Sequence, residues 1–153
     1  MKLTDHLPKT LIKVPLSVTD KTQAITQLVD LLAEHGYTET RDTLLQAVLE
    51  REAQRTTGIG RGFAIPHAKC DAVKDIVIAL GRPATPIDFA AIDGQPVSLI
   101  ALLVSPIHAT STHIGALTRL SRLVSNGRVL EGLLSAADAD ELYDIISNND
   151  PDT

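Results

Sequence analysis

Apolar residues recur every three or four positions in two segments of the first third of the chain, a spacing typical of amphipathic helices. The first segment follows Asp20, which forms a capping-box pattern with Gln23, and it ends at Gly36, a residue that tolerates the left-handed conformation. The second segment runs from about Glu39 to Glu52. We therefore predict two half-buried helices. Their apolar faces consist of Ile25, Leu28, Val29 and Leu32 in the first and Leu44, Leu45, Val48 and Leu49 in the second.

Continuous apolar runs replace this helical spacing in the middle of the chain. Residues 76–80 are apolar throughout, and residues 97–104 are interrupted only by Ser98. A strand with one solvated face alternates, so unbroken runs predict strands that are covered on both faces. Phe63–Ile65 forms a short extended piece, because a residue before a proline disfavours helix. Three prolines between 81 and 96 predict turns and allow a short edge strand at residues 87–89.

Helical spacing returns in three segments of the last third. Ser111 or Thr112 can cap a helix that ends at Asn126-Gly127, and a short helix follows at about residues 129–134. Asp138 and Glu141 form a second capping-box pattern before a last helix. We expect residues 148–153 to be a frayed tail. The order of helix pair, strands and helix group predicts one α/β domain over residues 1–153, with helices on both faces of a small sheet.

Charge and composition exclude several functional classes. Fourteen Lys and Arg residues stand against nineteen Asp and Glu residues, which gives a formal net charge of −5. This balance lacks the basic surface that a duplex binder needs, and two Tyr, two Phe and no Trp offer little stacking surface for single strands. We expect no nucleic-acid partner. A hydrophobic content of 44% also excludes a disordered chain.

Cysteine usage and hydropathy bear on the compartment. The single cysteine, Cys70, cannot form an intramolecular disulfide and is expected to be a small buried residue. The first six residues lack the apolar core of a signal peptide, and the apolar stretch at residues 97–104 is too short to span a membrane. These features predict a cytoplasmic protein without direct membrane insertion.

The segment from Thr56 to Ala68 carries the candidate chemistry. It holds three alternate glycines, which by themselves indicate a flexible loop, and their spacing matches neither a dinucleotide fingerprint nor a P-loop. Pro66 fixes the backbone just before His67, which gives the imidazole a defined position suited to a nucleophile or general base. A lone histidine is more often structural than catalytic, so both interpretations stay open at this point.

Local charge favours an anion beside His67. Nearby cations lower the pKa of a histidine, keep its ring neutral at pH 7 and stabilise a phosphoryl group transferred onto it. The same charges are equally suited to solvating the end of the second helix. Four bases and one acid lie between residues 51 and 69: Arg51, Arg55, Arg61, Lys69 and Glu52.

A zinc site is a weaker alternative. His108 and His113 follow the apolar run at 97–104, and loops after strands of an α/β sheet commonly bind ligands. With His67 and Cys70 they offer four potential ligands. Their spacing contains neither a CxxC pair nor two histidines on one helical turn, which are the usual patterns of zinc sites.

The segment from Thr56 to Ala68 also resembles part of a known protein family. Residues 57–68 are similar to the active-site signature of the fructose/mannitol-type enzyme IIA components of the phosphoenolpyruvate-dependent phosphotransferase system, which include stand-alone nitrogen-regulatory proteins. Similarity extends to residues 49–53, 87–97, 103–106 and 113–117. The signature residues are Thr57-Gly58-Ile59-Gly60-Arg61-Gly62-Phe63-Ala64-Ile65-Pro66-His67-Ala68.

This resemblance implies a small mixed β-sheet between two helical layers and a phosphohistidine carrier. His67 would accept a phosphoryl group from an HPr-like phosphocarrier and pass it to a IIB-type partner, or hold it as a regulatory signal. Arg51 and His113 would support the transfer, and no metal or organic cofactor is implied. The protein would be a stoichiometric phosphotransferase component rather than a complete sugar kinase. The alternative is a non-catalytic binding module that retains the fold; the presence of all three residues favours the carrier.

Overall fold

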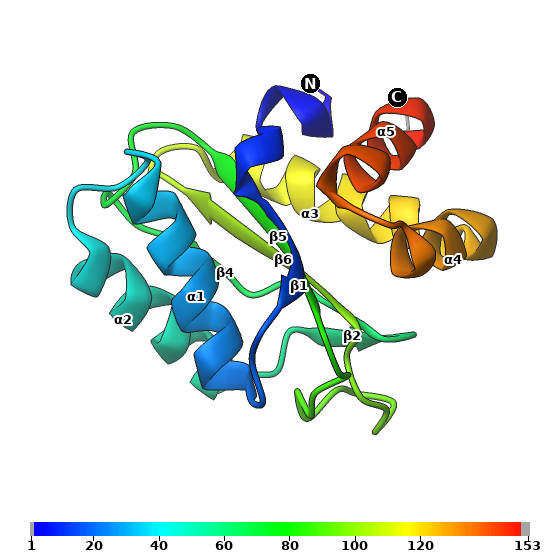
Figure 1. The fold of residues 1–153 in the computed structure, drawn as a ribbon. Coiled ribbons are helices and arrows are strands. Elements are labelled where there is room, and N and C mark those ends of the chain that lie inside the picture. The colour runs from blue at the N-terminus through cyan, green and yellow to red at the C-terminus, as the bar shows by residue number, and fades with distance from the viewer. Residues whose placement is uncertain (1, 151–153) are drawn as a thin grey trace.

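The chain folds into three layers, with a sheet between two groups of helices (Figure 1). This computed structural model describes residues 2–150. Two short 3-10 helices, Leu3–Asp5 and Lys9–Leu11, precede the first strand. The strands are β1 (Ile12–Leu16), β2 (Gly58–Gly60), β3 (Phe63–Ala64), β4 (His67–Lys69), β5 (Val77–Pro83) and β6 (Leu99–Ser105). The helices are α1 (Lys21–Glu34), α2 (Arg41–Gln54), α3 (Thr110–Ser125), α4 (Gly127–Ser135) and α5 (Ala139–Asn149).

The sheet is mixed and six-stranded, which confirms the α/β class. Its order is β1-β5-β6-β3-β2, and β4 also pairs with β6. β5 runs antiparallel to β6, whereas β3 and β4 both run parallel to it. β1 is parallel to β5, and β2 is antiparallel to β3. β6 is thus the central strand on which the segment carrying the signature is aligned.

Both faces of the sheet are covered, as the unbroken apolar runs predict. Every residue of β6 is buried. Ile100 and Leu102 belong to the core cluster shared with α1 and α2, whereas Leu99 and Leu103 belong to the cluster shared with α3, α4 and α5. Figure 1 shows α1 and α2 on one side of the sheet and the other three helices on the opposite side.

Capping residues set several helix ends as predicted. The Asp20 carboxylate accepts a hydrogen bond from the Gln23 amide at 2.8 Å, and Gly36 follows α1 with φ +79°. Asp138 caps α5 in the same way through the Glu141 amide. Asn126 ends α3 and caps α4, because its side chain accepts from the first amides of the next helix. These local interactions are why the sequence alone located the helix boundaries.

Other boundaries differ from expectation. α3 begins after Ala109 with no side-chain cap, so Ser111 and Thr112 lie inside the helix. Residues 87–89 form no strand but a single bridge between Ile87 and Val97. β1 was not predicted, because Pro15 and its mixed burial hide an edge strand that pairs only with β5.

The expectation of a frayed tail is wrong for residues 148–150. α5 continues to Asn149, and the Asp150 side chain is only 3% exposed. Its carboxylate accepts a hydrogen bond from the Leu3 amide and forms an ion pair with Arg119 at 3.1 Å. This contact joins both ends of the described chain to α3. Residues 151–153 lie outside the described part of the structure.

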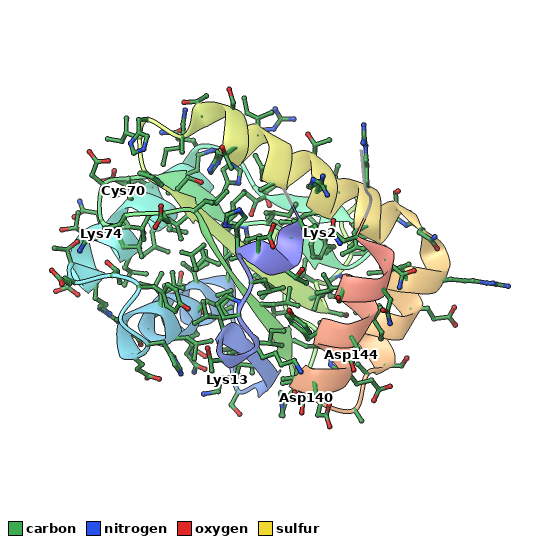
Figure 2. All side chains as sticks on the ribbon, turned by 90° about the horizontal axis from the view of Figure 1, so that it is seen from above. Lys2, Lys13, Cys70, Lys74, Asp140 and Asp144 are labelled. Carbon is green, nitrogen blue, oxygen red and sulfur yellow. The ribbon has the colours of Figure 1, made fainter. Side chains whose placement is uncertain are left out.

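We predict that Asp150→Ala lowers the free energy of unfolding by about 1.5–3 kcal/mol, because it removes the charge-assisted hydrogen bonds that the buried Asp150 carboxylate accepts from Arg119 and from the Leu3 amide. Denaturant unfolding followed by circular dichroism measures this change. The control is Asp144→Ala on the exposed face of α5 (Figure 2), which should change the same quantity by less than about 0.5 kcal/mol. Equal effects in the two variants would contradict the anchoring role of Asp150.

Candidate functional site

His67 is positioned by a strand that is interrupted and then resumes. β3 and β4 lie along the same side of β6 in one continuous register, with Phe63 opposite Leu99 and His67 opposite Leu103. Pro66 has no N–H to donate, so the pairing breaks before it and restarts at His67. The sequence prediction placed His67 after a strand. It is instead the first residue of β4, and its side chain is half-buried.

A backbone carbonyl determines which nitrogen of His67 carries the proton. The Nδ1 atom lies 2.8 Å from the carbonyl oxygen of Ile65. A carbonyl oxygen only accepts, so Nδ1 must be the protonated nitrogen that donates this bond. In a neutral imidazole the other nitrogen, Nε2, then holds an unshared electron pair. His67 is therefore arranged as a nucleophile at Nε2.

The surroundings keep the His67 ring neutral. Burial lowers the pKa of His67 below its usual value, and the positive charge of Arg51 lowers it further. The bond to Ile65 and the charge of Glu52 act in the opposite direction but do not reverse the shift. The sequence suggested nearby cations as the cause of a low pKa. The structure shows that burial is the larger one.

His113 comes from the first turn of α3 and lies against His67. The centroids of the two rings are 5.4 Å apart in an edge-to-face arrangement. His113 is only 4% exposed. Burial, followed by the charges of His67 and Lys69, lowers the pKa of His113 to about 4, so this ring is also neutral at pH 7. The sequence-based pairing of the two histidines is thus reproduced by the geometry.

Ser105 orients His113, and its role was not predicted from the sequence. Its Oγ lies 2.7 Å from His113 Nδ1, and the residue is fully buried at the end of β6. When the hydroxyl donates to Nδ1, the neutral His113 carries its proton on Nε2 and can donate it to an anion. A serine that ends an otherwise apolar strand was the only available signal, and such residues are common.

Two adjoining hollows surround His67 and contain most of the predicted cations. Their volumes are about 430 and 300 Å³, and Arg51, His67 and Leu117 line both. Lys69 and His113 line the first, and Arg55 lines the second. The structure therefore brings Arg51 and His113 together with His67, as expected.

Arg61 and Glu52 do not contribute charge to the two hollows, although the count of charged residues near His67 in the sequence included both. The Arg61 guanidinium donates to the Ser125 carbonyl at 3.0 Å, at the end of α3, and lines neither hollow. Glu52 is buried and ion-paired with Lys21 at 2.9 Å. The hollows consequently present the cations Arg51, Arg55 and Lys69 against the carboxylate of Glu50, a balance that favours an anionic ligand.

The zinc alternative finds no geometric support. Residues 2–150 contain no group of three or more His, Cys, Asp or Glu side chains placed to hold a metal ion. His108 is exposed, and Cys70, expected to be buried, is partly exposed (Figure 2).

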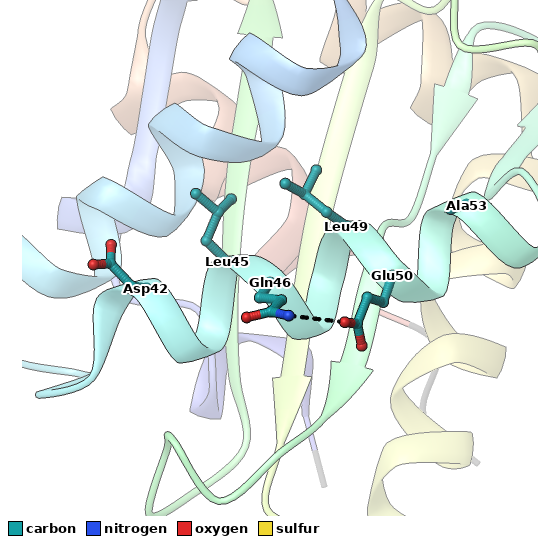
Figure 3. Close-up of a pocket in the computed structure, with 6 residues that line it drawn as sticks. All are labelled: Asp42, Leu45, Gln46, Leu49, Glu50 and Ala53. Atoms are coloured by element: carbon teal, nitrogen blue, oxygen red, sulfur yellow. Dashed lines mark hydrogen bonds between the residues drawn. The ribbon is translucent and has the colours of Figure 1, made fainter.

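A third hollow, on the outer face of α2, has a different character (Figure 3). Its volume is about 440 Å³, and it contains neither a histidine nor a cation. Gln46 donates to Glu50 across it at 3.0 Å. An anion would have no cationic or histidine partner among the residues that line this hollow. The residues lining the third hollow are Asp42, Leu45, Gln46, Leu49, Glu50 and Ala53.

The pKa of His113 makes stability depend on pH. Its folded-state pKa of about 4 lies below the ordinary value of 6.5, so between these pH values the unfolded chain binds a proton that the folded chain does not. Stability from this group is complete above pH 6.5 and declines as the pH falls toward 4. We predict that His113→Asn reduces the fall in unfolding free energy over this window, by up to about 1.4 kcal/mol per pH unit.

The measurement is denaturant unfolding at four pH values between 7.5 and 4.5. His108→Asn is the matched control, since His108 is exposed, and its curve should run parallel to that of the wild type. A His113→Asn curve parallel to the wild type would contradict the prediction.

Comparisons with known proteins identify the family of this chain. The family model of the phosphoenolpyruvate-dependent sugar phosphotransferase system, EIIA 2, matches residues 5–149. The chain is 38% identical over 150 residues to the fructose-specific EIIABC component of Bacillus subtilis, covering 98% of this chain but only 24% of that protein. It is 35% identical to a nitrogen regulatory protein of Bradyrhizobium diazoefficiens, covering 96% of this chain and 95% of that protein.

Solved structures show the same fold. The nitrogen regulatory protein IIA-Ntr of Neisseria meningitidis superposes with a TM-score of 0.87 at 32% identity, over 93% of this chain and 97% of that one. Enzyme IIA of the Escherichia coli mannitol system, solved in complex with phosphorylated enzyme IIB, gives a TM-score of 0.79 at 20% identity, over 93% and 99%. The resemblance inferred from the signature is confirmed, and this chain belongs to the EIIA 2 family of the phosphoenolpyruvate-dependent sugar phosphotransferase system.

Proposed function

We propose that this protein is a phosphohistidine carrier that accepts a phosphoryl group on Nε2 of His67. The donor is an HPr-like phosphocarrier, and the group is passed to a IIB-type partner or held as a regulatory signal. The observation that carries the proposal is the hydrogen bond from Nδ1 to the Ile65 carbonyl, which leaves Nε2 unprotonated beside Arg51. The cytoplasmic location expected from the sequence is part of the same proposal.

The transfer is an in-line displacement between two imidazole nitrogens. The Nε2 electron pair of His67 attacks phosphorus, and the donor's P–N bond breaks with its electron pair returning to the donor ring. Such a reaction needs positioning and charge stabilisation more than covalent help from the protein. Arg51 is the fixed cation that stabilises the phosphoryl oxygens, and the neutral His113 donates a hydrogen bond to them.

The surface beside the hollows suits a protein partner. Ile59 and Ile92 line the second hollow and are 39% and 69% exposed. Exposed apolar side chains next to a charged centre are typical of a docking surface. The Escherichia coli mannitol IIA protein, which shares the fold, was solved with phosphorylated IIB, and this supports a IIB-type partner here.

We predict that incubation with labelled phosphoenolpyruvate, enzyme I and an HPr-like carrier adds about one acid-labile phosphate per chain, because phosphohistidine hydrolyses in acid. His67→Gln should abolish the label while the unfolding midpoint stays close to that of the wild type. The control His108→Gln alters an exposed histidine and should be labelled normally. Acid-stable label, or label on His67→Gln, would disprove the assignment of His67. An unlabelled wild type would favour the non-catalytic binding module.

We further predict that Arg51→Gln slows phosphoryl transfer about ten- to a hundredfold, because a charge-assisted hydrogen bond contributes about 1.5–3 kcal/mol when it is made in the transition state. His113→Ala should show a smaller loss, since a neutral imidazole offers one donor and no fixed charge. Rapid-quench kinetics measures both rates. Arg61→Gln is the control, because its guanidinium binds the end of α3. Wild-type rates in both site variants would show that His67 works without them.

A further inference from the structure

Glu52 is a buried carboxylate with a full set of partners just behind the site. It lies in the last turn of α2, next to Arg51, and is 6% exposed. One carboxylate oxygen accepts the Thr57 amide at 2.9 Å and the Lys21 ammonium at 2.9 Å. The other accepts the Thr57 hydroxyl. Glu52 lines neither hollow at His67, so it has no direct role toward a phosphoryl group.

Thr57 continues this contact toward the phosphoacceptor. Its carbonyl oxygen accepts the Ile65 amide at 3.0 Å, and the Ile65 carbonyl accepts His67 Nδ1 at 2.8 Å. Thr57 and Ile65 are 4% and 3% exposed, so water does not compete for these bonds. An unbroken series of hydrogen bonds therefore links the Glu52 carboxylate to the His67 ring.

The series acts where the pairing with the central strand is interrupted. Between Ala64 and His67 the Pro66 carbonyl still accepts the Leu103 amide of β6 at 3.0 Å, whereas the Ile65 amide bonds to Thr57. The position of Ile65 therefore depends on Thr57 as well as on β6. Thr57 in turn is held by two bonds to an ionised carboxylate, and charge-assisted bonds are about twice as strong as neutral ones.

We propose that Glu52 and Thr57 are positioning residues for His67. They hold the Ile65 carbonyl against Nδ1 and thereby keep the proton off Nε2, the nitrogen that accepts the phosphoryl group. The inference rests on the proposed function in taking Nε2 as the acceptor. The ion pair with Lys21 balances the buried charge of Glu52.

The test compares Thr57→Val, Thr57→Ser and Glu52→Gln. Thr57→Val preserves the shape of the side chain and the hydrogen bond from the backbone amide of residue 57 to Glu52, but it removes the hydroxyl. Long-range proton–nitrogen NMR on the unphosphorylated protein reports the tautomer and pKa of His67. We expect Thr57→Val and Glu52→Gln to increase the Nε2-protonated tautomer and to slow phosphoryl transfer about tenfold, the effect of one lost hydrogen bond. Thr57→Ser should restore both.

The pKa of His67 provides an independent measure of the hydrogen bond to the Ile65 carbonyl. The bond to the Ile65 carbonyl raises it, so a weakened bond in Thr57→Val lowers the pKa of His67 further. Asp150→Ala is the matched control, because Asp150 is likewise a buried carboxylate bound to a cation and a backbone amide. It should reduce stability while the tautomer, the pKa and the transfer rate of His67 stay as in the wild type.

The outcomes separate this inference from the proposed function. A folded Thr57→Val with the wild-type tautomer would overturn the inference, whether or not its transfer rate changes. A tautomer shift common to Asp150→Ala would overturn it too, because it would follow from lost stability alone. A wild type that is never phosphorylated would end the proposed function, yet the tautomer of Thr57→Val would still decide whether Glu52 and Thr57 position His67.

Discussion

The hydrogen bond between His67 Nδ1 and the Ile65 carbonyl is the interaction on which the site depends. It forms where Pro66, which has no N–H to donate, interrupts the pairing of the signature segment with β6. The register nevertheless resumes at His67, so the imidazole is held by a strand and not by a loose loop. The interrupted strand thus fixes both the side chain and the tautomer of His67.

Burial and charge act together on the two histidines. Removing an imidazole from water disfavours its protonated form, and this is the largest cause of the lowered pKa of both His67 and His113. Arg51 and Lys69 add repulsion to a second positive charge and remain available for an anion. The centre therefore combines neutral rings with fixed cations, a combination suited to forming and holding a phosphorylated nitrogen.

Side chains from several separate elements of the fold meet at or just behind this centre. α2 supplies Arg51 and Glu52, β4 supplies His67, β6 supplies Ser105, and α3 supplies His113. The central sheet with helices on both faces keeps these elements in register (Figure 1). Solved relatives with this fold include a nitrogen regulatory protein and a mannitol IIA protein. The fold alone therefore does not distinguish a nitrogen regulatory protein from a mannitol IIA protein.

The sequence by itself determined the helices and the two central strands, and it singled out the candidate residues His67, Arg51 and His113, which the structure brings together. Capping residues such as Asp20 and Asp138 act within one turn, and unbroken apolar runs report burial directly, so local pattern was sufficient. Only the tertiary structure decided that Asp150 is anchored by Arg119, that Arg61 turns away to α3, that Ser105 contacts His113 and that Thr57 bonds to Ile65. The reason is physical: these contacts join residues from different elements, and their strength comes from burial that no single segment creates alone.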